Sequence, residues 1–189
     1  YYVLFAIAFS LTLKVAGVWN FAQAGVMGLA FYGMFAAIRG WDWHPAAGFA
    51  FGLALAVALA AAVEVWGYRV LKRRRSSALL LFIFAIVVAE FVAYLLSLLF
   101  GTEPQSLTKS MAAEIYLVGG VAISSWDLGA LALALCACLA LAAYLRFTSQ
   151  GQFMSAVADN APLAELYGIS ASRAMLAAMA IAAALVSVG

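Results

Sequence analysis

Charged side chains are scarce in this chain and occupy only 10% of its 189 residues. Soluble proteins of ordinary composition carry about 25%. Hydrophobic residues make up 68% of the chain, and the mean hydropathy is +1.09. This balance excludes a soluble globular domain and predicts an integral membrane protein. The net charge of +2 arises from a local basic cluster, so it gives no indication of nucleic-acid binding.

Histidine and cysteine are nearly absent, so the common metal and catalytic sites lack their usual side chains. The only histidine is His44, and the two cysteines, Cys136 and Cys138, stand two positions apart in an apolar segment. That spacing puts them on roughly opposite faces of a helix, so we expect neither a disulfide nor a metal pair. The chain also lacks a GxxxxGK[ST] phosphate-binding motif and a Ser-His-Asp set. We therefore expect a protein that is not an enzyme and binds no metal or cofactor of its own.

Long apolar runs fill most of the sequence. A bilayer core of about 30 Å needs about 20 apolar residues per helix. Six runs reach or approach this length and predict an all-α polytopic membrane protein with spans at 1–19, 22–38, 46–66, 78–100, 129–145 and 174–189. The first run lacks a basic leader and is too long for a signal peptide. Both terminal runs are cut within apolar sequence, so we expect a single membrane domain over 1–189, truncated at both ends.

Lysine and arginine collect in two places along the chain. They are Arg69, Lys72, Arg73, Arg74 and Arg75 after the third run, and Arg146 and Arg173 around residues 151–168. Cytoplasmic loops carry the excess of basic residues, and two predicted spans separate the two places, so both belong on the cytoplasmic side. The first place also favours contact with anionic membrane lipid. Loop 101–128 then lies outside, where two strand-like runs flanking Gly119-Gly120 predict a small extracytoplasmic β-hairpin.

Residues 151–168 are the longest stretch that is neither apolar enough to span a bilayer nor strongly charged. The residues that favour a bend stand at its middle: Asp159, Asn160 and Pro162. In its second half, Leu163, Leu166 and Tyr167 share one face of a short helix, and Gly168 is placed to cap it. An apolar stripe between polar groups suits a groove on a partner protein. We predict two short helices with a bend, the second forming a cytoplasmic docking surface.

Polar residues inside the predicted spans are few. Glu90 lies midway along the fourth span, where a carboxylate costs about 2.5 to 3.5 kcal/mol to insert. It either faces a water-filled path or is hydrogen-bonded to a neighbouring helix. Asn20 and Gln23 share a face at the start of the second span, beside the small pair Ala24 and Gly28 that allows another helix to approach closely. These amides either line a substrate path or bond to neighbouring helices.

Three sequence blocks together resemble the permeases of branched-chain amino acid ABC importers. They are NFAQAG at 20–25, VEVWGYRVLKRRR at 63–75 and GQFMSAVADNAPLAELYGIS at 151–170, followed by an Ala-rich span. The last block is similar to the cytoplasmic loop of that family that engages the ATPase. The positions that match its pattern are Gly151, Met154, Ala156, Ala158, Ala164, Gly168 and Ile169. Ser155 and Ser170 depart from it, because arginine and asparagine are usual there.

The resemblance implies a multi-pass, pore-forming subunit of the bacterial plasma (inner) membrane. Its partners would be a second related permease subunit, two cytoplasmic ABC ATPases that use ATP, and a periplasmic solute-binding protein. Loop 146–173 would couple ATPase motion to alternating access through Gly151, Ala156, Asp159, Leu163, Ala164, Leu166, Tyr167 and Gly168. The candidate residues of the substrate path are Asn20, Gln23 and Glu90.

The implied substrate is a branched-chain or other hydrophobic amino acid, with urea or short amides as the alternative within the same family. Two other classes of protein stay open. An ion-coupled secondary transporter would need an intramembrane charge pair or proton relay, to which Glu90 alone contributes little. A purely structural membrane anchor would not depend on the polar residues of the second span.

Overall fold

The computed structural model describes residues 2–103, 105, 115–118 and 121–188, and nearly all of them are helical. The α-helices in this part of the chain are α1 (Tyr2–Ala16), α2 (Ala22–Phe35), α3 (Pro45–Ala62), α4 (Arg69–Arg73), α5 (Ala78–Phe100), α6 (Ser125–Phe147), α7 (Ser149–Leu166) and α8 (Ala171–Val188). Two π-helical turns, η1 (Ala36–Gly40) and η2 (Val63–Tyr68), extend α2 and join α3 to α4. The predicted helical class is confirmed.

Among the residues that the structure describes, four helices are long and apolar enough to cross a membrane: Pro45–Arg73, Ala78–Phe100, Gly129–Phe147 and Ala171–Val188. They correspond to the predicted spans 46–66, 78–100, 129–145 and 174–189. The first predicted span is shorter than expected, because α1 has 15 residues and ends where Gly17 takes a left-handed φ of +65°. Helix α2 has 14 residues before its π-helical extension. The count of six spans therefore stays a prediction.

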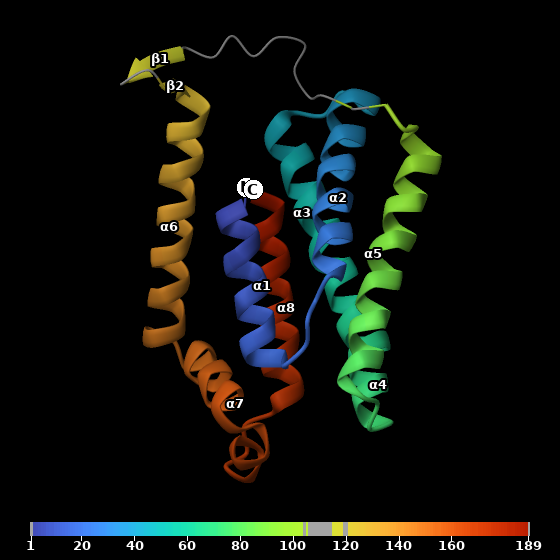
Figure 1. Cartoon of the computed structure of the whole chain (residues 1–189), viewed down its shortest axis with the longest axis vertical. Helices are drawn as coiled ribbons and strands as arrows, with labels where there is room; N and C mark the ends of the chain where they lie inside the picture. Colours follow the sequence, from blue (N-terminus) through green and yellow to red (C-terminus); the bar gives the residue numbers. More distant parts are fainter. Residues whose placement is uncertain (1, 104, 106–114, 119–120, 189) are drawn as a thin grey trace.

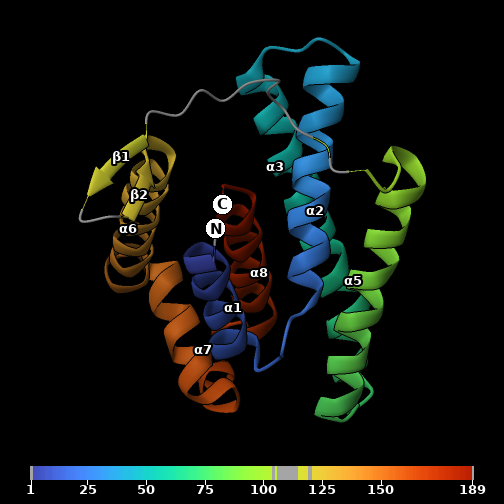
Figure 2. The same cartoon turned by 45° about the horizontal axis from the view of Figure 1, so that its top comes forward.

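The helices stand side by side, with α1 and α8 at the centre (Figure 1). Helix α1 packs mainly on α8, and α2 packs mainly on α3 and α5. Helix α6 stands apart and joins the bundle through α7 and α1, as a second view also shows (Figure 2). Helices α1, α3 and α6 run toward one end of the bundle, while α2, α5 and α8 run toward the other.

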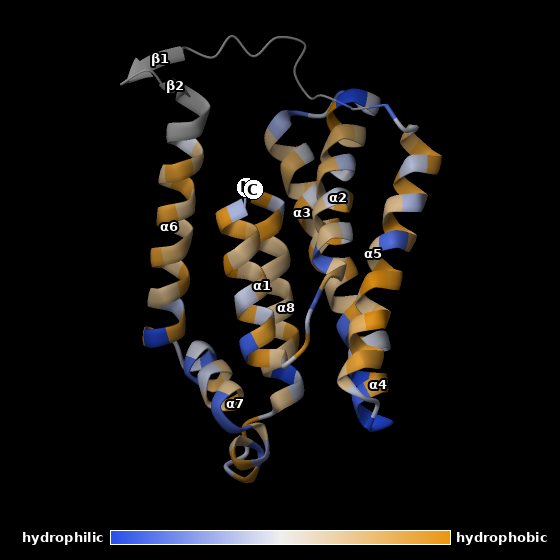
Figure 3. Ribbon diagram, viewed as in Figure 1, coloured by the Kyte–Doolittle hydropathy of each residue, from blue (hydrophilic) through white to orange (hydrophobic). Residues whose placement is uncertain are grey.

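Hydrophilic colour marks the end of the bundle where α4 ends and α7 lies, and it marks the loop after α2 at the other end as well (Figure 3). The basic run after α3 and the loop around α7 therefore lie at the same end, as the count of spans predicted. Strands β1 (Ile115–Val118) and β2 (Val121–Ser124) lie near the opposite end and pair antiparallel, with Val118 opposite Val121. They coincide with the two predicted strand-like runs. The predicted Gly119-Gly120 turn lies outside the described residues, and the extracytoplasmic position of the hairpin stays a prediction.

Small residues fill the contacts between the central helices. Alanines dominate the buried cluster, among them Ala8, Ala16, Ala22, Ala30, Ala56, Ala60, Ala182 and Ala183. Lipid tails are as apolar as leucine, so membrane helices associate through close packing and polar bonds more than through the hydrophobic effect. Helices α3 and α2 approach closely, because a Cβ added at Gly52 would collide with the carbonyl oxygen of Ala30.

The Gly52 contact generates a stability prediction. We expect Gly52→Ala to lower the free energy of unfolding by about 1–3 kcal/mol, because the added methyl must push α2 and α3 apart. Gly129→Ala is the matched control, since this exposed helical glycine has nothing within 4 Å of an added Cβ. Thermal unfolding in detergent measures both variants. Equal melting temperatures would show that the two helices do not approach as closely as described.

Candidate functional site

The break between α1 and α2 is held by the buried side chain of Asn20. This residue is 5% exposed and lies in the non-helical stretch 17–21. Its Oδ1 accepts a hydrogen bond from the Tyr68 hydroxyl at 2.9 Å, and its Nδ2 donates to the Met179 sulfur at 3.2 Å. One amide therefore ties the start of α2 to η2 and to α8.

Gln23 performs a similar role one turn later. Its Nε2 lies 3.2 Å from the carbonyl oxygen of Ala8 and 3.3 Å from the Thr12 hydroxyl, both in α1. Asn20 and Gln23 also line a cavity of about 10 Å³ between α2, α3 and α8. That space suits a single water molecule at most. In this conformation the two amides bond to neighbouring helices, which is one of the two alternatives that the sequence left open.

The π-helical turn η2 completes this polar cluster. Glu64 and Tyr68 are buried in it, and π-helical turns often occur at functional sites. One turn later, the Lys72 ammonium donates to the carbonyl oxygen of Ala16 at 2.6 Å and contacts the Met175 sulfur at 3.3 Å. Sequence reasoning missed Tyr68 and Lys72 as binding partners. Glu64, Tyr68 and Lys72 are spaced four residues apart, which puts them on one face of a helix. That spacing was the signal in the sequence that could have identified them.

Helix α7 is bent as predicted. Its backbone leaves the helical region at Asn160, with φ −158° and ψ 95°, so two shorter helices share one label. The Asn160 Oδ1 accepts a hydrogen bond from the Leu163 amide at 3.0 Å and caps the second helix. Pro162 fits inside that first turn, where its missing N–H would have no partner. The second helix ends where Gly168 takes a φ of +81°.

The residues predicted for the coupling loop divide into buried and exposed groups. Leu163, Leu166 and Tyr167 are 49%, 83% and 80% exposed, and we call them the apolar stripe. Gly151 and Ala164 are buried. At Gly151 the start of α7 lies so close to α6 that an added Cβ would collide with the backbone of Tyr144. Ala156 is half-buried, whereas Asp159 and Gly168 are exposed.

Glu90 lies apart from the Asn20 and Gln23 cluster. Its side chain is exposed and lines a groove of about 310 Å³ between α5 and α2. No hydrogen bond to it is found within the part of the chain that the structure describes. The structure therefore brings Asn20 and Gln23 together and leaves Glu90, the third predicted path residue, in a separate cavity.

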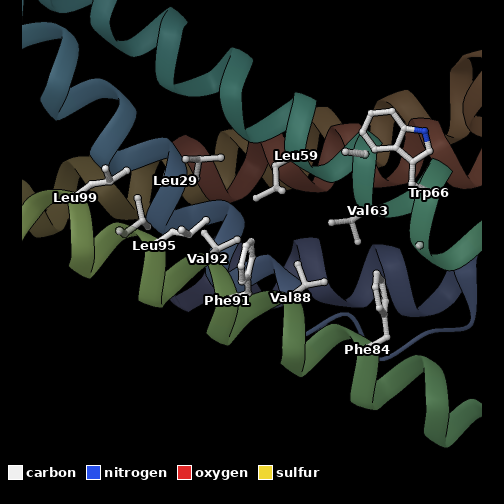
Figure 4. A pocket seen from close by; sticks show the side chains of 13 residues that line it. Leu29, Leu59, Val63, Trp66, Phe84, Val88, Phe91, Val92, Leu95 and Leu99 are labelled. Atoms are coloured by element: carbon white, nitrogen blue, oxygen red, sulfur yellow. The ribbon is translucent and has the colours of Figure 1, made fainter.

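A neighbouring face of α5 borders a larger groove of about 440 Å³ between α5, α2 and the α3–η2 segment (Figure 4), and Leu96 lines both grooves. Its lining includes Leu59, Val63, Phe84 and Val88, and none of its 13 lining residues is charged. Such a surface can hold apolar groups but has no ionic group to orient a charged ligand. We therefore do not consider it a site for recognition of an amino acid.

The hydrogen bond between Tyr68 and Asn20 can be tested directly. We expect Tyr68→Phe to destabilise the protein by about 1–3 kcal/mol, because Asn20 Oδ1 then loses its partner in a dry environment. Tyr94→Phe is the matched control, because Tyr94 is 68% exposed whereas Tyr68 is fully buried. Thermal unfolding in the same detergent compares the two. A Tyr68→Phe variant as stable as Tyr94→Phe would show that this bond does not hold η2 to α2.

Comparison with known proteins assigns the chain to a family. The family model described as the permease component of branched-chain amino acid transport systems matches residues 1–188. No individual curated protein and no solved structure matches the chain. The family match covers the α1–α2 break, the groove beside Glu90 and the bent α7 alike. The chain belongs to the permease components of branched-chain amino acid transport systems.

Proposed function

We propose that this chain is the membrane subunit of an ABC importer that carries branched-chain or other hydrophobic amino acids across the bacterial inner membrane. The observation that carries the proposal is the apolar stripe of α7. Leucine and tyrosine side chains that are 49% to 83% exposed at a polar loop suit a groove on a partner protein. The partner would be a cytoplasmic ABC ATPase, which binds and hydrolyses the ATP.

The packing of α7 supports transmission of force from the stripe. Met154, Val157 and Ala164 are buried against α1 and α8, in a cluster that includes Leu11 and Ala178. Helix α7 is thus attached to these two helices by well-packed side chains. A push on the stripe would move α7 together with α1 and α8, and such rigid-body motion is a common basis of switching.

The polar cluster would extend this motion to α2. Helix α8 contacts Asn20 through Met179, and α1 contacts Gln23 through Ala8 and Thr12. Any shift of α1 or α8 therefore acts on the start of α2. We propose that this connection couples ATPase motion to alternating access.

The remaining features follow from the same assignment. The end of the bundle that holds α4 and α7 would face the cytoplasm, because basic residues collect there. Helices α1 and α2, which lie alongside the four long helices (Figure 1), would complete six crossings. A second related permease subunit, a second ATPase and a periplasmic solute-binding protein would complete the transporter.

The stripe is tested by Leu166→Asp. We expect loss of ATPase association and a fall in uptake of about tenfold or more, because a carboxylate must be desolvated in an apolar groove. Leu166 is 83% exposed, so the variant should fold normally. Ser149→Asp is the matched control, since it adds the same charge at an exposed position at the start of α7. Normal association and uptake by Leu166→Asp would remove the docking proposal.

The position of Asn20 and Gln23 relative to the substrate path is tested by cysteine substitution. Both side chains are buried here beside a cavity of about 10 Å³, so they would join the path only when α2 separates from α3 and α8. We expect Gln23→Cys to react with small thiol reagents during ATP turnover and not at rest, in a background without Cys136 and Cys138. Lack of reaction in every transport state would exclude this position from the path.

A further inference from the structure

Glu90 is the only charged residue of α5 and stands at the middle of the helix. An uncompensated carboxylate in a bilayer core costs about 2.5 to 3.5 kcal/mol by insertion measurements. Its side chain is exposed and lines the groove between α5 and α2. A carboxylate in this position requires either water or a cationic group close to it.

The groove beside Glu90 is shaped by small residues. Helix α5 contributes Ala89, Ala93 and Ser97 at intervals of four, and α2 contributes Gly25 and Gly28. The two helices touch at Gly25, where an added Cβ would lie 3.1 Å from the Val92 Cβ. The absence of bulky side chains at these positions leaves a volume of about 310 Å³, within the usual range of small-molecule sites.

A second cavity adjoins this groove at Gly28, which belongs to the lining of both. The second cavity measures about 760 Å³, and its lining includes Met27, Phe31, Met34 and Phe49. These side chains are apolar, so the cavity suits a hydrocarbon group. An anionic groove and an apolar cavity thus meet along one face of α2.

We propose that Glu90 binds the ammonium group of the transported amino acid, whose apolar side chain points toward the cavity beyond Gly28. The proposal rests on the proposed function, because it names a contact made by the substrate of that importer. An ammonium group offers the carboxylate a charge-assisted hydrogen bond, which is stronger than a bond between neutral groups. Urea and short amides carry no such cation, so Glu90 favours an amino acid over that alternative substrate class.

Transport kinetics test the proposal in the complete transporter, reconstituted in vesicles with its partner subunits. We expect Glu90→Gln to raise the KM for leucine by about tenfold or more, with kcat changed much less, because hydrogen bonds to charged groups contribute more than neutral ones. Glu90→Asp should restore part of the loss, since it keeps the charge. Asp42→Asn removes a carboxylate from the loop between α2 and α3 and should leave the KM unchanged.

Substrate protection provides a second measurement that does not require altering Glu90. Ser97→Cys places a thiol on the groove lining, in a background where Cys136 and Cys138 are replaced by alanine. We expect leucine to slow its reaction with a methanethiosulfonate reagent during turnover. The hydroxy acid analogue of leucine, 2-hydroxy-4-methylpentanoate, should not protect the thiol because it lacks the ammonium group.

The outcomes separate this proposal from the proposed function. If the wild-type transporter carries leucine with ATP while Glu90→Gln keeps its KM, or leucine does not protect Ser97→Cys, then the Glu90 proposal is wrong and the importer assignment stands. If Glu90→Gln separates the permease subunits on size exclusion, Glu90 holds a subunit contact and the proposal is again wrong. Lack of any ATP-dependent amino acid uptake by the wild type would instead overturn the proposed function.

Discussion

The hydrogen bonds of Asn20 are the constraint on which the rest of the bundle depends. A helix pair in lipid gains little from the hydrophobic effect, so small residues and buried polar bonds determine which helices meet. The Asn20 side chain accepts a hydrogen bond from the Tyr68 hydroxyl and donates one to the Met179 sulfur. Segments η2, α8 and the start of α2 therefore meet at one side chain. Gln23 adds α1 through Ala8 and Thr12. Four segments, of which η2 and α8 are distant in sequence from α1 and α2, are thereby held at one point in the membrane domain.

The same four segments connect the centre of the bundle to its polar end. Helices α1 and α8 carry the buried cluster with Leu11 and Ala178 against which α7 packs, and they also carry the partners of Gln23 and Asn20. Lys72 strengthens this link through the carbonyl oxygen of Ala16 at the end of α1. The apolar stripe of α7 and the break before α2 therefore lie at two ends of one packed unit.

Helix α5 has two faces with different chemistry. Phe84 and Val88 border the uncharged groove of Figure 4, whereas Ala89, Glu90 and Ser97 border the smaller groove on the adjacent face. The helix inserts readily because a single carboxylate is offset by many apolar side chains. The Glu90 carboxylate therefore does not prevent α5 from inserting into the membrane.

The sequence alone determined the membrane class, the limits of α5, the bend of α7 and the exposed stripe, because these depend on local composition, helical spacing and turn residues. Long-range neighbours were decided by the tertiary structure. The amides of Asn20 and Gln23 could equally serve a path or a helix contact until their partners in α1, η2 and α8 were known. Glu90 likewise had two possible environments, and only the packing of α5 on α2 placed it in a groove. Partners far apart in the chain leave no periodic signal, so hydrogen bonds between helices must be read from the fold.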